Sequence, residues 1–393
     1  MGRVPYDLAA RQPYLSPPFS DAEYDRRIRA VNDAMAAEGF DALVVYASGA
    51  APSAVTYLTN YVPVYGHVFA VLRDDGRITV ATDGILHDEP MHSMIWTCRV
   101  PDVRIARGPI YGGSADEVAS LAGEAAVGAR RVGLVGAAAV PHTLYQTLSQ
   151  RVPVLHPADH ILAGVRLRKS DEEIAKMREA GRIADQAYDA VFAAIGPDVE
   201  ETAVAAAAVH RMHVLGGREG FRTCVVSGDH AGLKHGHPRR RKMRDGEAVF
   251  IDLGVDVAGY LSDVSRCTVV GPAAGAARDL LQVGLDLYHA GLRVMGPGRT
   301  IDEVSNALLA VVRGTRYEPY YCPGGFGHGI GMSLLEAPGL FAGNTMELRP
   351  GMTVAYEPMV VVERLGAGVV EDTILITEAG YERLSRYAVV TWR

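Results

Sequence analysis

Acidic residues form two pairs in the C-terminal half of the chain, and each pair flanks a hairpin-like pattern. The segment AVFIDLGVD leads through a turn to GYLSDVSRCTVV, which places Asp252 and Asp263 eleven residues apart. A hairpin that turns at residues 257–259 would set these carboxylates opposite each other on one face. Two adjacent ionised carboxylates repel each other, so the pattern favours a polyvalent cation between them.

A second pair repeats the arrangement in TVAYEPMVV and AGVVEDTILIT, where Glu357 and Glu371 lie fourteen residues apart around position 364. Between the two pairs, the glycine-rich segment GGFGHGIG presents the imidazole of His328 on backbone that can adopt unusual dihedral angles. Carboxylates with one imidazole form an oxygen-rich set that favours Mn²⁺, Co²⁺ or Fe²⁺ over a thiolate zinc site. The set suffices for two ions when carboxylates bridge them.

Two similar halves must position these residues, starting at about Lys169. In each half a long helix ends at a Gly-Pro pair, at residues 196–197 and 296–297, and a second helix follows. Two residue pairs form capping boxes that open a helix in each half: Ser170 with Glu173, and Thr300 with Glu303. Helices and strands repeated in this way predict a pseudo-twofold α+β domain with its site between the halves.

The preceding segment predicts a separate α/β domain with mixed strands. A helix that opens at Ser20, a buried strand over 42–46 and a hairpin over 68–81 follow one another. The stretch 151–168 contains Pro and Gly residues typical of a domain boundary. We therefore expect two domains, at residues 1–165 and 166–393.

Charge and hydropathy narrow the class of protein. The 393 residues carry a net charge of −7, which does not attract nucleic acid or anionic lipid. No apolar stretch approaches the roughly 18 to 20 residues that span a bilayer, and no secretory apolar run occurs near the N-terminus. The 4 cysteines are far apart, which predicts small buried residues rather than disulfides. We expect a cytoplasmic protein without nucleic-acid or membrane partners.

From about Lys169 to the C-terminus, the chain resembles the pita-bread (M24) metallopeptidase superfamily, which includes methionine aminopeptidase, aminopeptidase P, prolidase and creatinase. The segments IDLG, GYLSDVSR, GFGHGIG, YEP and VVEDTILIT stand in that family's order and approximate spacing. The preceding segment is similar to the domain that comes first in the prolidase, aminopeptidase P and creatinase branch. The resemblance implies an α/β N-terminal domain followed by an α+β pita-bread (creatinase/aminopeptidase) catalytic domain with pseudo-twofold symmetry.

The resemblance also implies roles for individual residues. Glu357 matches the family's general base, and His235, in GLKHGHP, resembles the histidine that contacts the substrate or assists the leaving group. We expect Glu336 to bind substrate. Two divalent ions are implied, Mn²⁺ first with Co²⁺, Fe²⁺ or Zn²⁺ as alternatives, as is a homodimer. Five residues are the implied metal ligands: Asp252, Asp263, His328, Glu357 and Glu371.

Three positions depart from the family's peptidase pattern. Leu335 stands seven residues after the metal histidine, where the peptidases carry a second histidine. Gly324 and Val369 replace a histidine and an arginine of the aminopeptidase P and prolidase branch. These changes leave the metal ligands intact but alter the groups that would hold a dipeptide.

The leading hypothesis is a dinuclear metal-dependent hydrolase, an M24-type aminopeptidase or dipeptidase, that cleaves a peptide or imide bond as Xaa-Pro peptidases do. One alternative, favoured by Leu335, is a non-peptidase relative that acts on a small nitrogenous or zwitterionic metabolite as an amidohydrolase or lyase. Another is a non-catalytic binding protein on the same scaffold, which retention of all the ligands disfavours. The expected substrate is therefore a small peptide or a small-molecule amide.

Simpler interpretations stay open for single residues. Any one of the carboxylates, taken alone, is more simply explained by a solvated position at a strand end. For His235 the functional role is the favoured interpretation, and a loop histidine bonded to backbone is the alternative. Glu336 fits a structural role as well as a functional one. The basic run at 239–242 is more simply a solvated loop than an anion clamp. The tyrosines within 317–321 either line a substrate wall or pack beneath the glycine loop.

Overall fold

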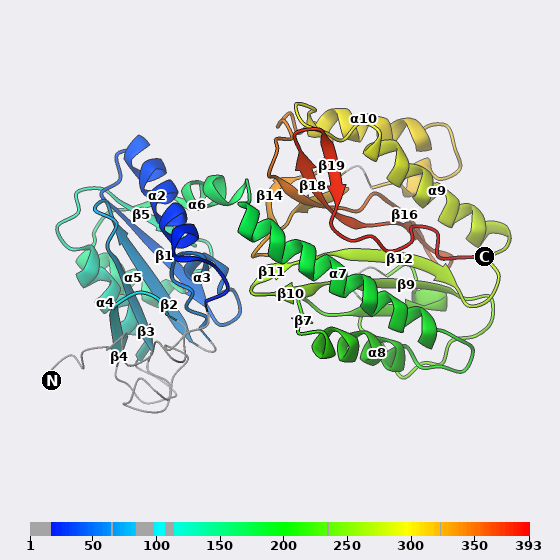
Figure 1. The fold of residues 1–393 in the computed structure, drawn as a ribbon, viewed down its shortest axis with the longest axis horizontal. Coiled ribbons are helices and arrows are strands. Elements are labelled where there is room, and N and C mark those ends of the chain that lie inside the picture. Colours follow the sequence, from blue (N-terminus) through cyan, green and yellow to red (C-terminus); the bar gives the residue numbers. More distant parts are fainter. Residues whose placement is uncertain (1–16, 64–65, 84–97, 107–113, 234–235, 323) are drawn as a thin grey trace. The chain divides into compact units, whose positions relative to one another are not determined.

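The computed structural model describes residues 17–63, 66–83, 98–106, 114–233, 236–322 and 324–393. The chain separates into two compact units, Met1–Arg166 and Leu167–Arg393 (Figure 1). Each unit is built around hydrophobic cores of its own.

The first unit is a mixed sheet with strand order β4-β3-β2-β1-β5-β6. Its central strand β1 pairs antiparallel with β2 and parallel with β5, and the burial of its side chains on both faces explains the apolar run ALVVY. Ser20 caps α2 by accepting a hydrogen bond from the Glu23 amide at 3.1 Å. The elements are α2 (Asp21–Ala37), β1 (Ala42–Ser48), α3 (Ser53–Thr59), β2 (His67–Arg73), β3 (Ile78–Asp83), β4 (Asp102–Ala106), α4 (Ser114–Ala126), β5 (Val132–Val135), α5 (His142–Arg151), β6 (Leu155–Pro157) and α6 (Asp159–Arg166).

The second unit begins with a helical pair and its strands. The long α7 opens with the predicted capping box of Ser170 and Glu173, and α8 packs beside it. Both helices contact strands of this half, where β9 pairs with β8 and β12. The elements are α7 (Asp171–Ala194), α8 (Glu201–Val214), β7 (Arg218–Glu219), β8 (Cys224–Ser227), the 3₁₀ helix η4 (Gly228–His230), β9 (Ala248–Leu253), β10 (Val255–Val257), β11 (Tyr260–Leu261) and β12 (Val264–Val269).

The second half repeats this plan with α9 and α10, the latter opened by the capping box of Thr300 and Glu303. A five-stranded sheet of order β14-β13-β15-β18-β19 forms its centre, and α9 packs on β16 and β17. The elements are α9 (Gly275–Leu292), α10 (Ile301–Val312), η5 (Glu318–Tyr320), β13 (Gly327–Gly329), β14 (Glu336–Gly339), β15 (Thr353–Tyr356), β16 (Met359–Val362), β17 (Gly366–Val369), β18 (Asp372–Thr377) and β19 (Gly380–Arg383).

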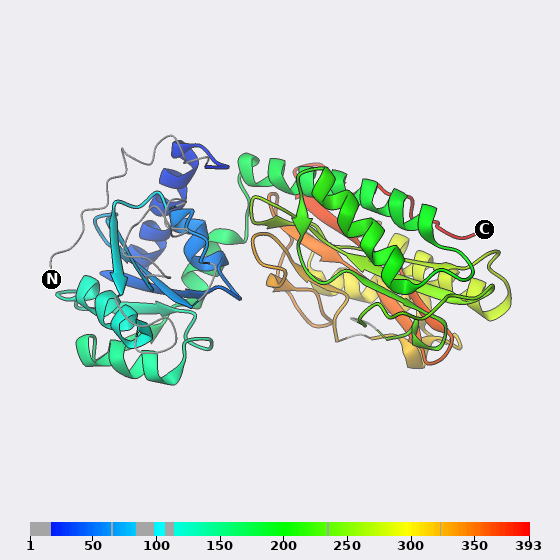
Figure 2. The same ribbon diagram turned by 90° about the horizontal axis from the view of Figure 1, so that it is seen from below.

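The two halves join along strands that are far apart in the sequence. Arg266 of β12 forms an isolated antiparallel bridge with Val370, which lies between β17 and β18. The β12 and β18 strands consequently lie side by side (Figures 1 and 2). This junction brings the two predicted carboxylate pairs close to each other within the second unit.

The two hairpins differ in how well their turns follow from the sequence. The second is centred on Arg364 as expected, because Tyr356 pairs with Asp372 and Met359 with Val369. Glu357 and Glu371 therefore occupy opposite positions of one long hairpin.

The expected register of the first hairpin is wrong. Its two-residue turn is Ala258-Gly259, both with positive φ, and Asp252 pairs with Ser265 rather than Asp263. Asp252 and Asp263 are therefore diagonal neighbours on one face. The turn needs a left-handed alanine, which a sequence pattern does not predict.

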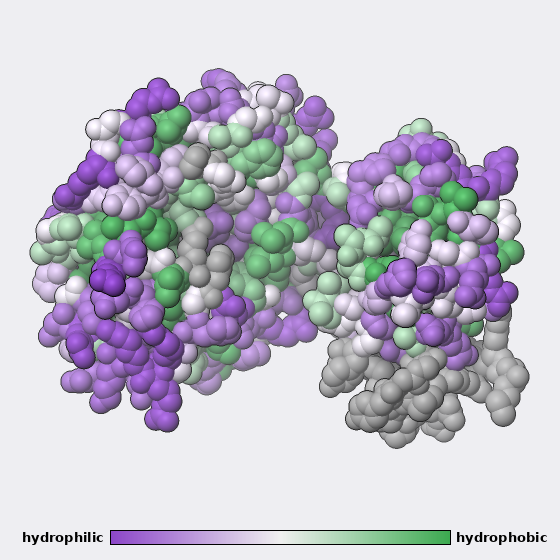
Figure 3. All heavy atoms as spheres, turned by 180° about the vertical axis from the view of Figure 1, so that it is seen from behind, coloured by the Kyte–Doolittle hydropathy of each residue, from purple (hydrophilic) through white to green (hydrophobic). Residues whose placement is uncertain are grey.

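On the face shown in Figure 3, hydrophobic side chains occur in patches separated by hydrophilic ones. None of the helices in the described ranges is long and apolar enough to cross a membrane. Cys98, Cys224 and Cys267 are buried, whereas Cys322 is exposed, contrary to the expectation that all four cysteines are buried.

Candidate metal centre

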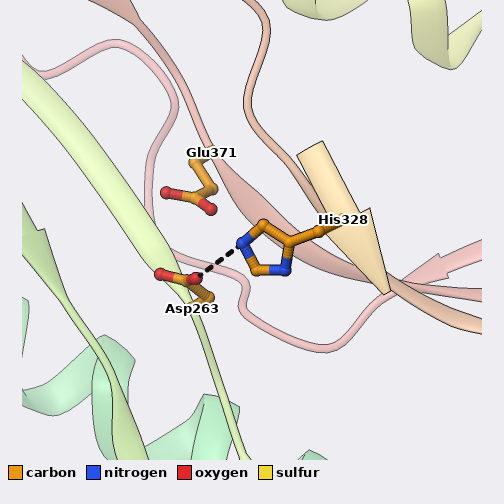
Figure 4. Close-up of side chains that lie close together, drawn as sticks. All are labelled: Asp263, His328 and Glu371. Carbon is orange, nitrogen blue, oxygen red and sulfur yellow. Dashed lines mark ion pairs between the residues drawn. The ribbon is translucent and has the colours of Figure 1, made fainter. Parts of the chain in front are cut away.

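Three of the predicted ligands converge in the second unit. Asp263 directly precedes β12, Glu371 directly precedes β18, and His328 is the middle residue of β13. Their side chains point toward one another (Figure 4), and one ligand atom from each lies within 4.8 Å of the others. Asp263 and Glu371 are only 5% and 2% exposed, so their negative charges are concentrated where water does little to screen them.

The backbone around His328 orients its ring. Nδ1 donates a hydrogen bond to the Gly329 carbonyl at 3.0 Å, which leaves the Nε2 lone pair facing Asp263 Oδ2 at 3.6 Å. Close packing of β13 requires glycine at position 329, because a Cβ there would lie 2.1 Å from the Ala337 carbonyl oxygen. Nε2 and Oδ2 both carry lone pairs, so a cation could bind to both atoms.

Burial and charge repulsion both act on the Asp263 carboxyl. Burial, followed by the negative charges of Glu371, Asp252 and Glu357, raises the pKa of the Asp263 carboxyl well above its ordinary value. The other three predicted carboxylates therefore all act electrostatically on Asp263. An oxygen-rich donor set with one imidazole and excess negative charge fits hard or borderline divalent cations.

Asp252 and Glu357 lie outside the group of three. Asp252 is 7% exposed in β9, and Glu357 is half-buried immediately after β15. The Glu357 amide donates to the Phe326 carbonyl at 3.0 Å, which fixes the backbone of the acid beside the segment that carries His328. The structure thus brings three predicted ligands into contact range and places the other two around them.

Two hydroxyl residues that the sequence analysis missed hold this group. Ser265 Oγ donates to Glu371 Oε2 at 2.5 Å, and Thr373 Oγ1 bonds to both the amide and the carbonyl of Asp263. Each hydroxyl residue lies two positions after a predicted ligand. The repeated patterns Asp-x-Ser and Glu-x-Thr are the sequence signal that points to them.

The remaining predicted site residues have different outcomes. His235 lies outside the described residues, so its role stays a prediction. Glu336 forms a buried ion pair with Lys169 at 3.1 Å and accepts from the Ser333 amide at 2.9 Å. These contacts support the structural interpretation of Glu336. Lys169 was not predicted, because 167 residues separate it from its partner.

The three departures from the peptidase pattern differ in exposure. Leu335 is 71% exposed, whereas Val369 is buried in a core cluster of the second unit. Gly324 lies in a turn with no neighbouring atom within 4 Å of an added Cβ.

The open interpretations of the basic run and the tyrosines are also resolved. Arg239 pairs with the fully buried Glu201, and Arg241 with Glu247 at 2.5 Å, so these guanidinium groups are engaged in ion pairs of the fold. Tyr317 and Tyr321 pack in a core cluster, while Tyr320 is 48% exposed. These residues belong mainly to the scaffold.

Comparison with known families agrees with this geometry. Residues 175–378 match the model of metallopeptidase family M24, and residues 27–168 match the creatinase/prolidase N-terminal domain. The chain belongs to metallopeptidase family M24, in the prolidase and aminopeptidase P branch. The resemblance inferred from the sequence is confirmed, and membership implies divalent metal ions.

Individual relatives support the same placement. The chain is 31% identical over 229 residues to an Xaa-Pro dipeptidase of Pyrococcus furiosus, covering 58% of this chain and 66% of that protein. It is 33% identical over 227 residues to an uncharacterized peptidase of Bacillus subtilis, covering 58% of this chain and 64% of that protein. The matched region thus spans slightly less than two thirds of these curated relatives.

Solved structures establish the fold. The crystal structure of the prolidase from Pyrococcus horikoshii matches with a TM-score of 0.80 at 24% identity, covering 92% of this chain and 99% of that chain. An α/β N-terminal domain followed by a pita-bread catalytic domain is therefore the fold of this protein, as the sequence predicts.

Proposed function

We propose that the protein is a dinuclear metal-dependent peptidase that hydrolyses small peptides, with Xaa-Pro dipeptides as the first substrate class to test. The observation that carries the proposal is the convergence of Asp263, His328 and Glu371 within 4.8 Å in a largely buried position. The name of the Pyrococcus furiosus relative supports the substrate class.

The proposed ligands are Asp252, Asp263, His328, Glu357 and Glu371. Divalent ions held there would supply Lewis-acid chemistry, polarising a scissile carbonyl and lowering the pKa of a water molecule. Oxygen-rich coordination favours Mn²⁺, with Co²⁺, Fe²⁺ and Zn²⁺ as alternatives.

Protein groups would perform the remaining tasks. Glu357 is the most accessible of the four acids and is the proposed general base that takes a proton from the attacking water. The His328 ring would keep its orientation during turnover, because its Nδ1 proton is committed to the Gly329 carbonyl. His235 remains the proposed residue for contact with the substrate or leaving group.

Further features belong to the same proposal. We assign residues 1–165 to the N-terminal domain and 166–393 to the catalytic domain, supported by the compact units Met1–Arg166 and Leu167–Arg393. A homodimer and a cytoplasmic location are also proposed, the former from the family resemblance and the latter from the composition.

A metal-dependent activity screen tests the function. The metal-free protein is loaded with Mn²⁺, Co²⁺, Fe²⁺ or Zn²⁺ and assayed with Xaa-Pro dipeptides, other dipeptides, longer peptides and small amides. We expect dipeptide turnover that chelation abolishes and metal restores. A matched pair of variants, His328→Ala and His289→Ala, should lose and keep turnover respectively, since His289 is exposed on α9. Metal-loaded protein that cleaves no peptide would refute the proposal.

A further inference from the structure

Each of the two hairpins carries a buried hydroxyl residue close to a proposed metal ligand. Asp263 directly precedes β12 and Glu371 directly precedes β18, and the second residue of each strand is a buried hydroxyl residue, Ser265 or Thr373. Each hydroxyl residue contacts the acidic residue of the opposite hairpin rather than its own.

The first contact fixes a carboxylate directly. Ser265 Oγ donates to Glu371 Oε2 at 2.5 Å, and the Glu371 amide donates to the Ser265 carbonyl at 3.1 Å. Ser265 therefore holds both the backbone and the side chain of Glu371. Because Ser265 is only 2% exposed, water has little access with which to replace its hydroxyl.

The second contact fixes the backbone of the other acid. The Asp263 amide donates to Thr373 Oγ1 at 2.8 Å, and the same hydroxyl donates to the Asp263 carbonyl at 3.1 Å. Thr373 is fully buried, so its hydroxyl satisfies two backbone groups that would otherwise lack hydrogen bonds in the core.

We propose that Ser265 and Thr373 form a reciprocal clasp, in which each hydroxyl locks the metal-binding acid of the opposite hairpin and so sets the separation of Asp263 and Glu371. The inference rests on the proposed metal-dependent function and deepens it. Both are positioning residues, because they act through the acids and do not touch the reacting atoms.

The physical need for such a clasp follows from the charges. Asp263 and Glu371 are buried acids of like charge, so they repel each other before an ion is bound. A flexible Glu371 side chain would turn away from Asp263, and ion binding would then have to reverse this movement. A donor already aimed at Glu371 Oε2 keeps the pair assembled, which raises metal affinity.

Metal titration of the folded variants tests the clasp without relying on activity. Manganese binding to the metal-free full-length chain is measured by calorimetry for the wild type, Ser265→Ala and Thr373→Val. We expect Ser265→Ala to weaken Mn²⁺ binding by about 10- to 100-fold, the usual range for loss of a group that orients a ligand. Thr373→Val should weaken binding less, because its contact reaches only the backbone of Asp263.

Two controls separate positioning from general stability. Thr268→Val removes another buried hydroxyl of β12, which donates to the Thr391 carbonyl at 2.6 Å and touches no proposed ligand. It should leave Mn²⁺ affinity unchanged even if the unfolding midpoint falls. Ser265→Thr retains a hydroxyl and should restore affinity toward the wild-type value.

The outcomes are distinguishable. Wild-type affinity in Ser265→Ala, or an equal loss in Thr268→Val, would overturn the clasp while leaving the proposed function standing. Failure of the wild type to bind Mn²⁺, Co²⁺, Fe²⁺ or Zn²⁺ would instead remove the proposed function, and the clasp with it.

Discussion

The two hairpins of the catalytic unit carry the same kind of ligand in different registers. In the second hairpin, Glu357 and Glu371 are opposite each other, whereas in the first, Asp252 and Asp263 are diagonal neighbours. What the halves share is the position directly before a return strand, occupied by Asp263 and Glu371. These two acids form the group with His328. The two halves therefore contribute to the candidate metal centre through equivalent positions directly before β12 and β18, rather than through equivalent cross-strand pairs.

The difference in burial suggests that the acids of the centre have different roles. Asp263 and Glu371 are almost fully buried and held by hydroxyl groups, whereas Glu357 is half-buried. The buried acids would only hold ions, whereas Glu357 would both contact an ion and exchange protons with water.

Removal of Asp263, one of the two almost fully buried acids, should have the largest effect on metal binding and turnover. Asp263→Ala is expected to abolish both bound metal and turnover, a loss at least as large as the roughly 10²- to 10³-fold typical of removing one transition-state stabiliser. Elemental analysis and peptide hydrolysis measure the two effects. Asp256→Asn, in the same hairpin but paired with Arg218, is the matched control and should keep both properties. Unchanged metal content in Asp263→Ala would contradict the assignment.

Neutralising the accessible acid of the second hairpin should act mainly on turnover. Glu357→Gln is expected to lower kcat by about 10²- to 10⁴-fold, the contribution of a general base, while the fold is retained. Steady-state kinetics at saturating Mn²⁺ measure this loss. A variant that keeps its kcat but loses affinity for metal would assign Glu357 to ion binding alone.

Breaking the ion pair that joins the hairpins should reduce stability. Arg266 Nη2 lies 2.9 Å from Asp372 Oδ1, and both side chains are fully buried. Arg266→Met would leave Arg383, at 2.8 Å, as a remaining ion-pair partner of Asp372, and it would remove the guanidinium donors to four backbone carbonyls. Because a buried ion pair and these buried hydrogen bonds are lost together, we expect the free energy of unfolding to fall by about 3–5 kcal/mol. Urea denaturation measures this loss. Arg364→Met, which removes an exposed pair with Glu363, should cause little change and serves as the control.

The acidic cluster should also make the metal-free protein sensitive to pH. The pKa of Asp263 is raised in the folded state from its ordinary value of 3.8, first by burial and then by the nearby acids. Between these two pKa values the folded state binds more protons than the unfolded state, so stability falls as the pH rises. Asp263→Asn should show a smaller fall in Tm over this window. An identical pH slope for the two proteins would contradict the proposed repulsion.

Much of the fold follows from local signals. Capping boxes at Ser170 and Thr300 open the predicted helices, and the apolar run at 42–46 is a central strand. The centre of the second hairpin follows from the spacing of its acids.

The rest depends on contacts that local patterns do not encode. The first hairpin differs from its expected register because Ala258 adopts a left-handed conformation that alanine disfavours. The pairing of Lys169 with Glu336 and of Arg266 with Asp372 depends on tertiary packing over more than 100 residues. The hydroxyl contacts of Ser265 and Thr373 likewise require the two hairpins to be docked.

Anomalous diffraction from crystals grown with Mn²⁺ would locate the ions among the proposed ligands. We expect two manganese peaks about 3.5–4 Å apart, enclosed by Asp252, Asp263, His328, Glu357 and Glu371. Peaks at other residues, or none in crystals of protein that has turned over peptide in Mn²⁺, would refute the proposed metal centre.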